Sequence, residues 1–364
     1  MLRLDNMSKI CTAVITLMVV LSCLESTASA QTPLDPVVIL YDASHGPQFA
    51  ADDADKGLKL MLDLVNASTR YMVRVNEVSP INDTILKDVD VLILASPDRT
   101  YEFTKSEALS IVEMLNNGSS LMILGDPAIS SNSTYWSGEP AFQDLGDNIA
   151  VNRLLDLLNI TGVGFSINAT GDDNFWPDTM FDYERALNNT YPWVIRLDPT
   201  TWESSHPIFK DINELILMTA SLKPVSLVSS IAHGAKTSFA QFRKGPNTFA
   251  NYSFPNMSLA EFEERPLSYS AINGTLPPWL SAFEYNNSRV VISGSTIMFT
   301  GRLLDLPKAE VKWFYAADNS RLFMNILGWL SEDFVEPETA VMPMLLISSA
   351  ILVIGVVFYL AKKR

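Results

Sequence analysis

Two short apolar runs on either side of one amphipathic segment constrain the fold of this chain more than any other feature. Residues 89–96 (Val-Asp-Val-Leu-Ile-Leu-Ala-Ser) and 120–126 (Ser-Leu-Met-Ile-Leu-Gly-Asp) are too short for core helices. Both are nearly continuous in apolar residues, which is typical of strands covered on both faces in a parallel sheet. The pair therefore predicts two buried strands.

The segment between these runs carries the signals of a helix. It begins with Thr104, has Glu107 three residues later and stops at Asn117-Gly118. A capping box at the start and a glycine stop at the end account for this pattern. The whole stretch 88–126 thus predicts one β-α-β unit, whose crossover is right-handed in a parallel sheet.

The rest of the chain extends this pattern. Helices are expected at 52–65, 148–158 and 318–331, the last with Leu322, Phe323, Ile326, Leu327, Trp329 and Leu330 as its buried face. Strands are expected at 37–42, 71–78 (near an edge), 164–170, 215–221, 225–232, 238–242 and 289–295, with 171–201 irregular. The order predicts a three-layer α/β sandwich with a mainly parallel sheet. It would occupy residues 31–335, with insertions near 127–201 and 249–288.

The first thirty residues have the pattern of a secretory signal. Basic Arg3 and Lys9 precede an apolar run at 10–24, and Ala28-Ser29-Ala30 forms a small-x-small cleavage site. We therefore expect residues 1–30 to be removed. A weaker alternative is a lipoprotein signal with Cys23 as the lipidated residue.

A second apolar segment has the properties of a membrane anchor. Residues 341–361 contain no charged side chain and are long enough to cross the hydrocarbon of a bilayer as one helix. The basic residues 362–364 follow directly, and such residues stay in the cytoplasm. With 336–340 as a linker, we expect a single-pass protein of the cell membrane with its N-terminal domain outside.

Cysteine and asparagine usage agree with export. The only cysteines, Cys11 and Cys23, fall within the expected signal, so the exported domain would contain no thiol nucleophile or thiolate metal site. A net charge of −15 disfavours nucleic acid as a partner. Asn-x-Ser/Thr sequons predict N-glycosylation at Asn66, Asn82, Asn117, Asn132, Asn159, Asn168, Asn188, Asn251, Asn256, Asn273 and Asn286.

Four pieces of the sequence, in this order, resemble one known domain. They are the stretch 88–122, the His206-Pro207-Ile208 element, the strand 289–295, and the helix running from Asp318-Asn319 to Trp329-Leu330. Together they resemble glutamine-amidotransferase-like (flavodoxin-like) sandwiches without catalytic machinery. Such domains occur in auxiliary proteins of gliding-motility-type ABC transporters and in intraflagellar transport protein 52. The resemblance implies a binding or assembly module with no catalytic residue and no cofactor.

Ligands of doubly wound sheets bind outside the carboxyl ends of the strands. The polar residues expected there, and predicted as ligand-binding, are Asp42, Ser44, His45, Ser96, Asp98, Asp126, Ser293 and Ser295. Two interpretations stay open at this point. The residues form a polar crevice for a sugar, peptide or metal, or they cap turns and helices.

The motifs of several chemistries are missing from the sequence. Ser44-His45 beside Asp42 lacks a Gly-x-Ser-x-Gly elbow, and adjacent residues rarely suit a nucleophile and its base. No His-Glu-x-x-His motif, EF-hand spacing, Walker A motif or dinucleotide fingerprint occurs. The acidic loop of Asp172, Asp173, Asp178 and Asp182 is the one candidate for Ca²⁺, and a solvated loop is the simpler interpretation.

The sequence thus favours a membrane-anchored, non-catalytic extracellular binding or assembly module, accessory to an ABC-type transport system. Its partners would be the bilayer, through 341–361, and a membrane protein such as a transporter permease. The alternative is an exported hydrolase of glycans or peptides that uses Asp42, Asp98 and Asp126, for which two carboxyls must lie about 5–10 Å apart. A surface coat glycoprotein is a third possibility.

Overall fold

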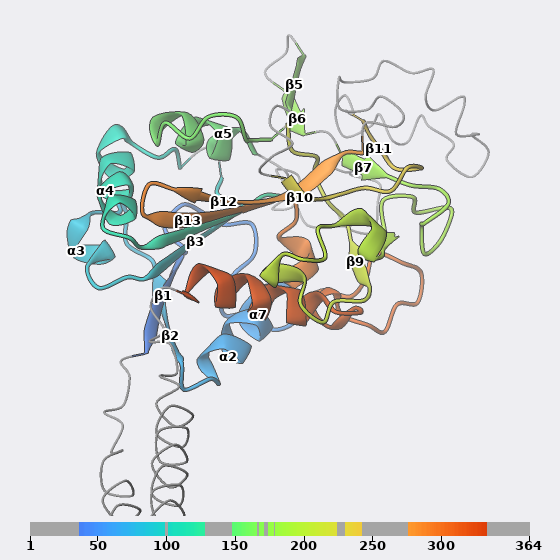
Figure 1. The fold of residues 1–364 in the computed structure, drawn as a ribbon, viewed down its shortest axis with the longest axis horizontal. Helices are drawn as coiled ribbons and strands as arrows, with labels where there is room; N and C mark the ends of the chain where they lie inside the picture. Colours follow the sequence, from blue (N-terminus) through green and yellow to red (C-terminus); the bar gives the residue numbers. More distant parts are fainter. Residues whose placement is uncertain are drawn as a thin grey trace, which may run out of the picture. The chain divides into compact units, whose positions relative to one another are not determined.

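A seven-stranded sheet forms the centre of the structure, with strand order β10-β12-β13-β4-β3-β1-β2 (Figure 1). This computed structural model describes residues 36–98, 101–127, 148–165, 167–170, 174–177, 179–223, 230–241 and 276–332. Among them, no helix is both long and apolar enough to cross a bilayer. The expected signal (1–30), linker (336–340), span (341–361) and tail (362–364) lie outside the described residues and stay predictions.

The sheet is mainly parallel, as the sequence predicts. Its parallel strands are β1 (Val37–Asp42), β2 (Tyr71–Asn76), β3 (Val91–Ala95), β4 (Ser120–Leu124) and β13 (Ser288–Ser293). Two antiparallel strands, β12 (Pro278–Tyr285) and β10 (Ser230–His233), extend the sheet beyond β13. The segment expected near an edge, 71–78, supplies the edge strand β2.

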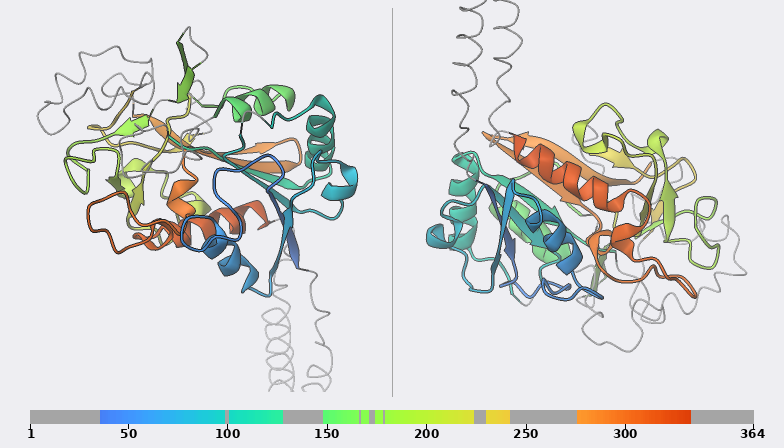
Figure 2. Two further views of the ribbon diagram at one scale, coloured as in Figure 1. Left: turned by 180° about the vertical axis from the view of Figure 1, so that it is seen from behind. Right: turned by 90° about the horizontal axis from the view of Figure 1, so that it is seen from below.

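Helices cover both faces of the sheet, which makes three layers (Figures 1 and 2). One face carries α3 (Asp83–Leu86), α4 (Lys105–Asn116) and α5 (Asn148–Leu157), and the other carries α2 (Lys59–Asn66) and α7 (Asn319–Leu330). Successive side chains along the strands point alternately into the two cores on opposite faces of the sheet. In β1, Ile39 and Tyr41 face the α2/α7 side, whereas Leu40 faces the α4/α5 side.

The expected capping box of α4 is confirmed with both of its hydrogen bonds. The Thr104 hydroxyl accepts from the backbone N–H of Glu107 at 3.2 Å, and the Glu107 carboxylate accepts from the backbone N–H of Thr104 at 2.8 Å. The helix ends at Asn116, and Gly118 follows with a φ of +98°, which a residue with a side chain rarely adopts.

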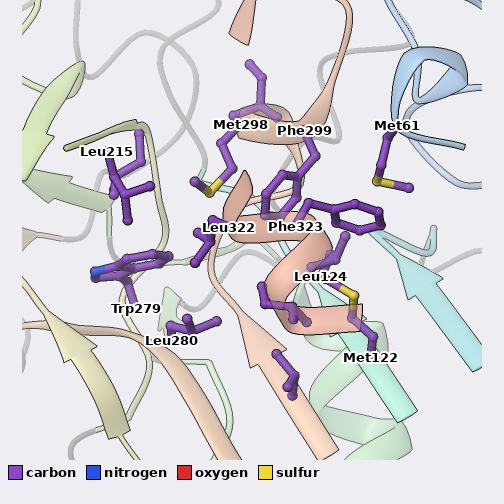
Figure 3. Packing of buried hydrophobic residues seen from close by; sticks show 14 of the residues in the cluster. Met61, Met122, Leu124, Leu215, Trp279, Leu280, Met298, Phe299, Leu322 and Phe323 are labelled. Carbon is purple, nitrogen blue, oxygen red and sulfur yellow. The ribbon is translucent and has the colours of Figure 1, made fainter. Parts of the chain in front are cut away.

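The packing of α7 against the sheet is shown in Figure 3. Leu322 and Phe323 are fully buried beside Met122 and Leu124 of β4, and the rings of Phe299 and Phe323 lie 5.2 Å apart. Burying a side chain of this size stabilises the fold by about 1.5–3 kcal/mol. All of the expected face is buried except its one tryptophan. Trp329 is partly exposed, and the Arg289 guanidinium lies over its ring at 5.3 Å.

The helix expected at 52–65 begins seven residues later, at Lys59. The reason is local. The Asp53 carboxylate accepts from the backbone N–H groups of Asp55 and Lys56, at 2.8 and 2.9 Å, and so stabilises a turn in place of the first helical turn. The expected buried residues of this helix are nevertheless buried.

The region expected to be irregular contains short strands. Three two-stranded antiparallel sheets are built from β5 (Ile167–Thr170) with β6 (Asn174–Pro177), β7 (Thr179–Phe181) with β11 (Phe239–Gln241), and β8 (Ile195–Leu197) with β9 (Leu215–Leu217). Sequence patterns also missed β12, since Pro278 and the preceding proline obscure the strand signal. It pairs with the neighbouring strand β13 over six residue pairs in an antiparallel hairpin, and this pairing places β12 in the sheet.

Candidate functional site

The predicted site residues follow the carboxyl ends of four parallel strands, but they form two separate clusters. Asp42 ends β1, Ser96 follows β3, Asp126 lies two residues after β4, and Ser293 ends β13. Because parallel strands end at the same edge, all four lie at one end of the sheet. Neighbouring loops then divide them into what we call the histidine cluster and the aspartate cluster.

The histidine cluster consists of Asp42, Ser44, His45, Asn76 and Glu107. Asp42 accepts hydrogen bonds from the Ser44 hydroxyl at 2.7 Å and the Asn76 amide at 3.0 Å. Its other oxygen lies 2.7 Å from His45 Nδ1, and His45 Nε2 lies 3.1 Å from a Glu107 oxygen. The imidazole is thus held between two carboxylates, and all three of these side chains are buried.

The histidine lowers the pKa of its aspartate neighbour. Burial by itself favours the neutral Asp42 carboxyl. Hydrogen bonds from His45 and Ser44, with the histidine charge, outweigh that effect and hold the pKa of Asp42 below its ordinary value.

Two further contacts lock the ring of His45 in place. It stacks on Phe103 with ring centroids 3.9 Å apart. Its carboxylate partner Glu107 also accepts from the backbone N–H of Ile81 at 2.9 Å, in addition to capping α4. The sequence showed only the capping role of Glu107, since the pairing with His45 joins segments sixty residues apart.

The arrangement of Ser44 and His45 differs from that of a serine nucleophile and its base. In a Ser-His-Asp triad the acid holds one ring nitrogen and the serine contacts the other. Here Ser44 Oγ lies 3.1 Å from Nδ1, the nitrogen that also faces Asp42, and Nε2 is engaged with Glu107. The cluster therefore has the geometry of an internal ion network, which disfavours nucleophilic catalysis by Ser44.

The aspartate cluster consists of Ser96, Asp126, Ser295 and Thr296. One oxygen of Asp126 accepts from the backbone N–H groups of Thr296 and Ile297, both at 3.0 Å. The other accepts from the Ser96 hydroxyl at 2.8 Å. The carboxyl therefore ties the ends of β3, β4 and β13 together. Ser96 has a φ of +41°, an uncommon conformation for a residue with a side chain, where the chain turns sharply after β3.

Burial dominates the electrostatics of this cluster. Asp126 has no exposed surface, and desolvation raises the pKa of its carboxyl to about 7 in spite of the hydrogen bonds from Ile297, Ser96 and Thr296. No cation contacts it in these hydrogen bonds, in contrast to Asp42, which faces His45. The two aspartates thus have opposite pKa shifts at the same end of the sheet.

The remaining predicted residues form hydrogen bonds within or between the same loops. Ser293 and Ser295 are fully buried, and Ser295 Oγ accepts from the backbone N–H of Met298 at 3.3 Å. Asp98 is half-buried, and its backbone N–H donates to the His45 carbonyl at 3.0 Å, which joins the loops after β1 and β3. The hydrogen-bonding capacity of both clusters is therefore directed largely into the protein, as in the turn-capping interpretation.

This orientation bears on the hydrolase alternative. Of the three carboxylates that it required, Asp126 binds backbone amides at the start of a 3-10 helix and Asp42 is paired with His45. Neither carboxylate is directed at an open crevice. The observed contacts thus disfavour Asp42 and Asp126 as the acid and base of a hydrolase.

Other candidate residues also have structural partners. Asp182, from the proposed Ca²⁺ loop, is buried and accepts from the Thr237 and Ser238 hydroxyls at 2.8 and 2.7 Å, and the three other aspartates of that loop lie outside the residues with described side chains. His206 caps a 3-10 helix, since its side chain accepts from the backbone N–H of Ile208. In the described part of the chain, no group of three or more metal-ligating side chains forms a potential metal site.

A surface pocket lies away from both clusters, beside β8 and the turn before it. Its lining is Glu184, Arg185, Ala186, Leu187, Arg196, Asp198 and Glu214. The two arginines are paired within it, Arg185 with Asp198 at 2.7 Å and Arg196 with Glu214 at 3.4 Å. The pocket contains none of the predicted site residues.

Six sequon asparagines have side chains that the structure describes, and all six are exposed: Asn66, Asn82, Asn117, Asn159, Asn188 and Asn286. The side chains of the other five sequons (Asn132, Asn168, Asn251, Asn256 and Asn273) lie outside the described residues. Asn82 also caps α3 through its side-chain oxygen, and its amide nitrogen donates to the carbonyl of Pro80 at 3.2 Å. Exposure is required for glycosylation, so N-glycosylation at these positions stays a prediction consistent with the fold.

Comparison with known proteins supports a transport-related family. A family model described as ABC-type uncharacterized transport system matches residues 59–326. No curated protein matches the chain. This family match confirms the resemblance to ABC-transporter auxiliary proteins expected from the sequence.

Several solved structures are similar in fold at low identity. The mmIFT52 N-terminal domain is 15% identical with a TM-score of 0.49, over 80% of this chain and 97% of that chain. A cytoplasmic protein from Salmonella typhimurium is 12% identical with a TM-score of 0.42, over 81% and 98%. A ThuA-like protein from Bacteroides uniformis is 13% identical with a TM-score of 0.38, over 83% and 93%.

Proposed function

This chain belongs to the family of ABC-type uncharacterized transport systems, and on that premise we propose that it is a membrane-anchored, extracellular auxiliary module of such a system. It binds a protein partner and catalyses no reaction. The family match over 59–326 carries the proposal, since it runs from the first residue of α2 into α7 and so covers most of the described fold.

Sequence features outside the described residues support the location. The signal-like residues 1–30 would direct export, and the uncharged segment 341–361 followed by basic 362–364 would hold the protein in the membrane with its main domain outside. Exposed sequons at six described positions agree with an extracellular surface.

The two clusters support a binding rather than a catalytic role. Their charged and polar groups brace the loops after β1, β3, β4 and β13 through internal hydrogen bonds. Rigid loops on a stable scaffold are the usual way in which a protein presents a recognition surface. We propose that the eight predicted site residues, from Asp42 to Ser295, act by holding this surface in shape for a partner.

Crosslinking in the native host tests the proposal. The full-length chain is crosslinked in its membrane, purified through an affinity tag, and its partners are identified by mass spectrometry. We expect an ABC-type permease or ATPase to be recovered. A matched control without residues 333–364 should be released from the membrane and lose that partner.

The outcome separates the alternatives. Recovery of permease or ATPase peptides with the full-length chain, absent from the control, supports the auxiliary role. Recovery of neither, with crosslinking verified on a known membrane complex, contradicts it.

A further inference from the structure

The two ends of the parallel strands carry different features, and we infer that the amino end of the sheet faces the membrane while the carboxyl end points away from it. This inference deepens the proposed function and rests on its membrane anchor at 341–361. It follows from where the described chain leaves the fold.

The last described helix ends at the amino end of the sheet. The carbonyl of Leu330 accepts from the hydroxyl of Ser120, the first residue of β4, at 2.8 Å. The next residue, Ser331, has its hydroxyl 3.3 Å from that of Tyr71, the first residue of β2. The chain therefore leaves the fold where β2 and β4 begin.

A third strand confirms this position. Arg289, the second residue of β13, donates to the carbonyl of Trp329 at 2.6 Å and forms an ion pair with Glu332 at 2.7 Å. The chain also enters the domain at this end, since the backbone N–H of Val37 donates to the carbonyl of Arg70 just before β2. Entry and exit thus share one end of the sheet.

Chain length keeps this end close to the bilayer. Only residues 333–340 separate Glu332 from the anchor, and eight residues span at most about 26–29 Å when fully extended. Strands of five or six residues rise about 17–20 Å from one end to the other. The strand starts are the part of the sheet next to the linker, and the inferred orientation places the histidine and aspartate clusters one strand length farther from the lipid.

Several exposed sequons also lie at the amino end of the sheet. Asn66 ends α2 just before β2, and Asn117 and Asn286 lie in the connections that lead into β4 and β13. The side chain of Asn286 contacts that of Asn116 at 2.9 Å. Asn159 lies beside them, because the neighbouring Leu158 carbonyl accepts from Tyr285 at the end of β12. Sugars at these four positions would crowd the amino end. Among the six sequons with described side chains, Asn82, which follows β2, and Asn188, in the turn before β8, are the exceptions.

The orientation assigns a surface to the partner. The loops after β1, β3 and β13, braced by the two clusters, face away from the membrane. Lipid headgroups would contact the opposite end.

Distance to the lipid tests the orientation on the full-length chain. Two exposed residues in matching connections are replaced singly by cysteine: Lys87→Cys, before β3 at the amino end, and Asp52→Cys, after β1 at the carboxyl end. Cys11 and Cys23 are replaced by serine in both. Each protein is labelled with a fluorophore and inserted into phosphatidylcholine vesicles containing a rhodamine-labelled lipid as energy acceptor.

We expect energy transfer to the lipid to be clearly stronger from position 87 than from position 52. Equal transfer, or stronger transfer from position 52, would overturn the orientation while leaving the anchor intact. Failure of the protein to float with the vesicles would instead overturn the anchor itself, and with it the orientation. Circular dichroism of both variants, compared with the unmodified chain, verifies that each is folded.

Discussion

Replacing Asp126 by asparagine tests whether ionisation of this buried carboxyl destabilises the fold. Burial raises the pKa of Asp126 from 3.8 to about 7. The folded state therefore binds this proton more tightly than the unfolded state. The resulting stabilisation of the fold is complete below pH 3.8 and is lost as the pH rises to about 7. At about 1.4 kcal/mol per pKa unit, the ionised form costs about 4 kcal/mol above pH 7.

The contacts of Asp126 suit an uncharged amide. The oxygen of asparagine can accept from the backbone N–H groups of Thr296 and Ile297, and its nitrogen can donate to Ser96. We therefore expect Asp126→Asn to be more stable than the unmodified chain at pH 8, by up to about 4 kcal/mol, and similar in stability at pH 4. Alanine at this position leaves both amides without an acceptor and should cost about 2–4 kcal/mol at pH 4. The same linkage should lower that cost by about 4 kcal/mol at pH 8, where the carboxyl of the unmodified chain is ionised.

Guanidinium denaturation of the full-length proteins in detergent, followed by tryptophan fluorescence at several pH values, measures these differences. Subtraction of the unmodified curve removes the effects of other titrating groups, such as Asp42. Asp63→Asn, at a half-exposed ion pair with Lys59, is the matched control and should change stability by less than about 1 kcal/mol at every pH. If the stability of Asp126→Asn followed the same pH profile as that of the unmodified chain, the raised pKa of Asp126 would be contradicted.

Further predictions concern the histidine cluster and two glycines, each measured by the same denaturation assay. Glu107→Ala should cost about 3–5 kcal/mol because it leaves the buried His45 with one carboxylate and the N–H of Ile81 without an acceptor. Thr104→Ala, which removes only the cap, should cost about 1 kcal/mol, and equal losses would contradict the His45–Glu107 pairing. Gly294→Ala should destabilise by more than 2 kcal/mol, since its Cβ would lie 2.1 Å from the carbonyl oxygen of Ala220. Gly328→Ala in α7 meets no atom within 4 Å and should stabilise by about 0.5–1 kcal/mol, so an equal effect of both substitutions would contradict the packing.

Local patterns were sufficient for the parallel half of the fold. The β3-α4-β4 unit carries its own strand runs, cap and stop, and its boundaries agree with the sequence within about two residues. The helix at Asn319–Leu330 was predicted for the same reason, from its apolar spacing and its start at Asp318. These signals lie within one element or one neighbouring pair, so no distant contact is needed to recognise them.

Strand pairing decided the other half. Strand β7 forms by pairing with β11, about sixty residues later, and β8 pairs with β9. Strands β6 and β12 pair with neighbouring strands in hairpins, but their own sequences give weak strand signals. Likewise, the late start of α2 depends on a turn made by the Asp53 side chain, which competes with the helix.

The sequence by itself determined the α/β class, the family, and the residues that follow the strand ends. Only the tertiary structure decided what those residues do. It joined His45 to Glu107 across sixty residues and Asp126 to Thr296 across 170. Residues for which the sequence left open a crevice or turn caps thus form two internal networks. The physical reason is burial, because a polar group removed from water must find its partner inside the protein, and the chain fold alone determines which partner lies within reach.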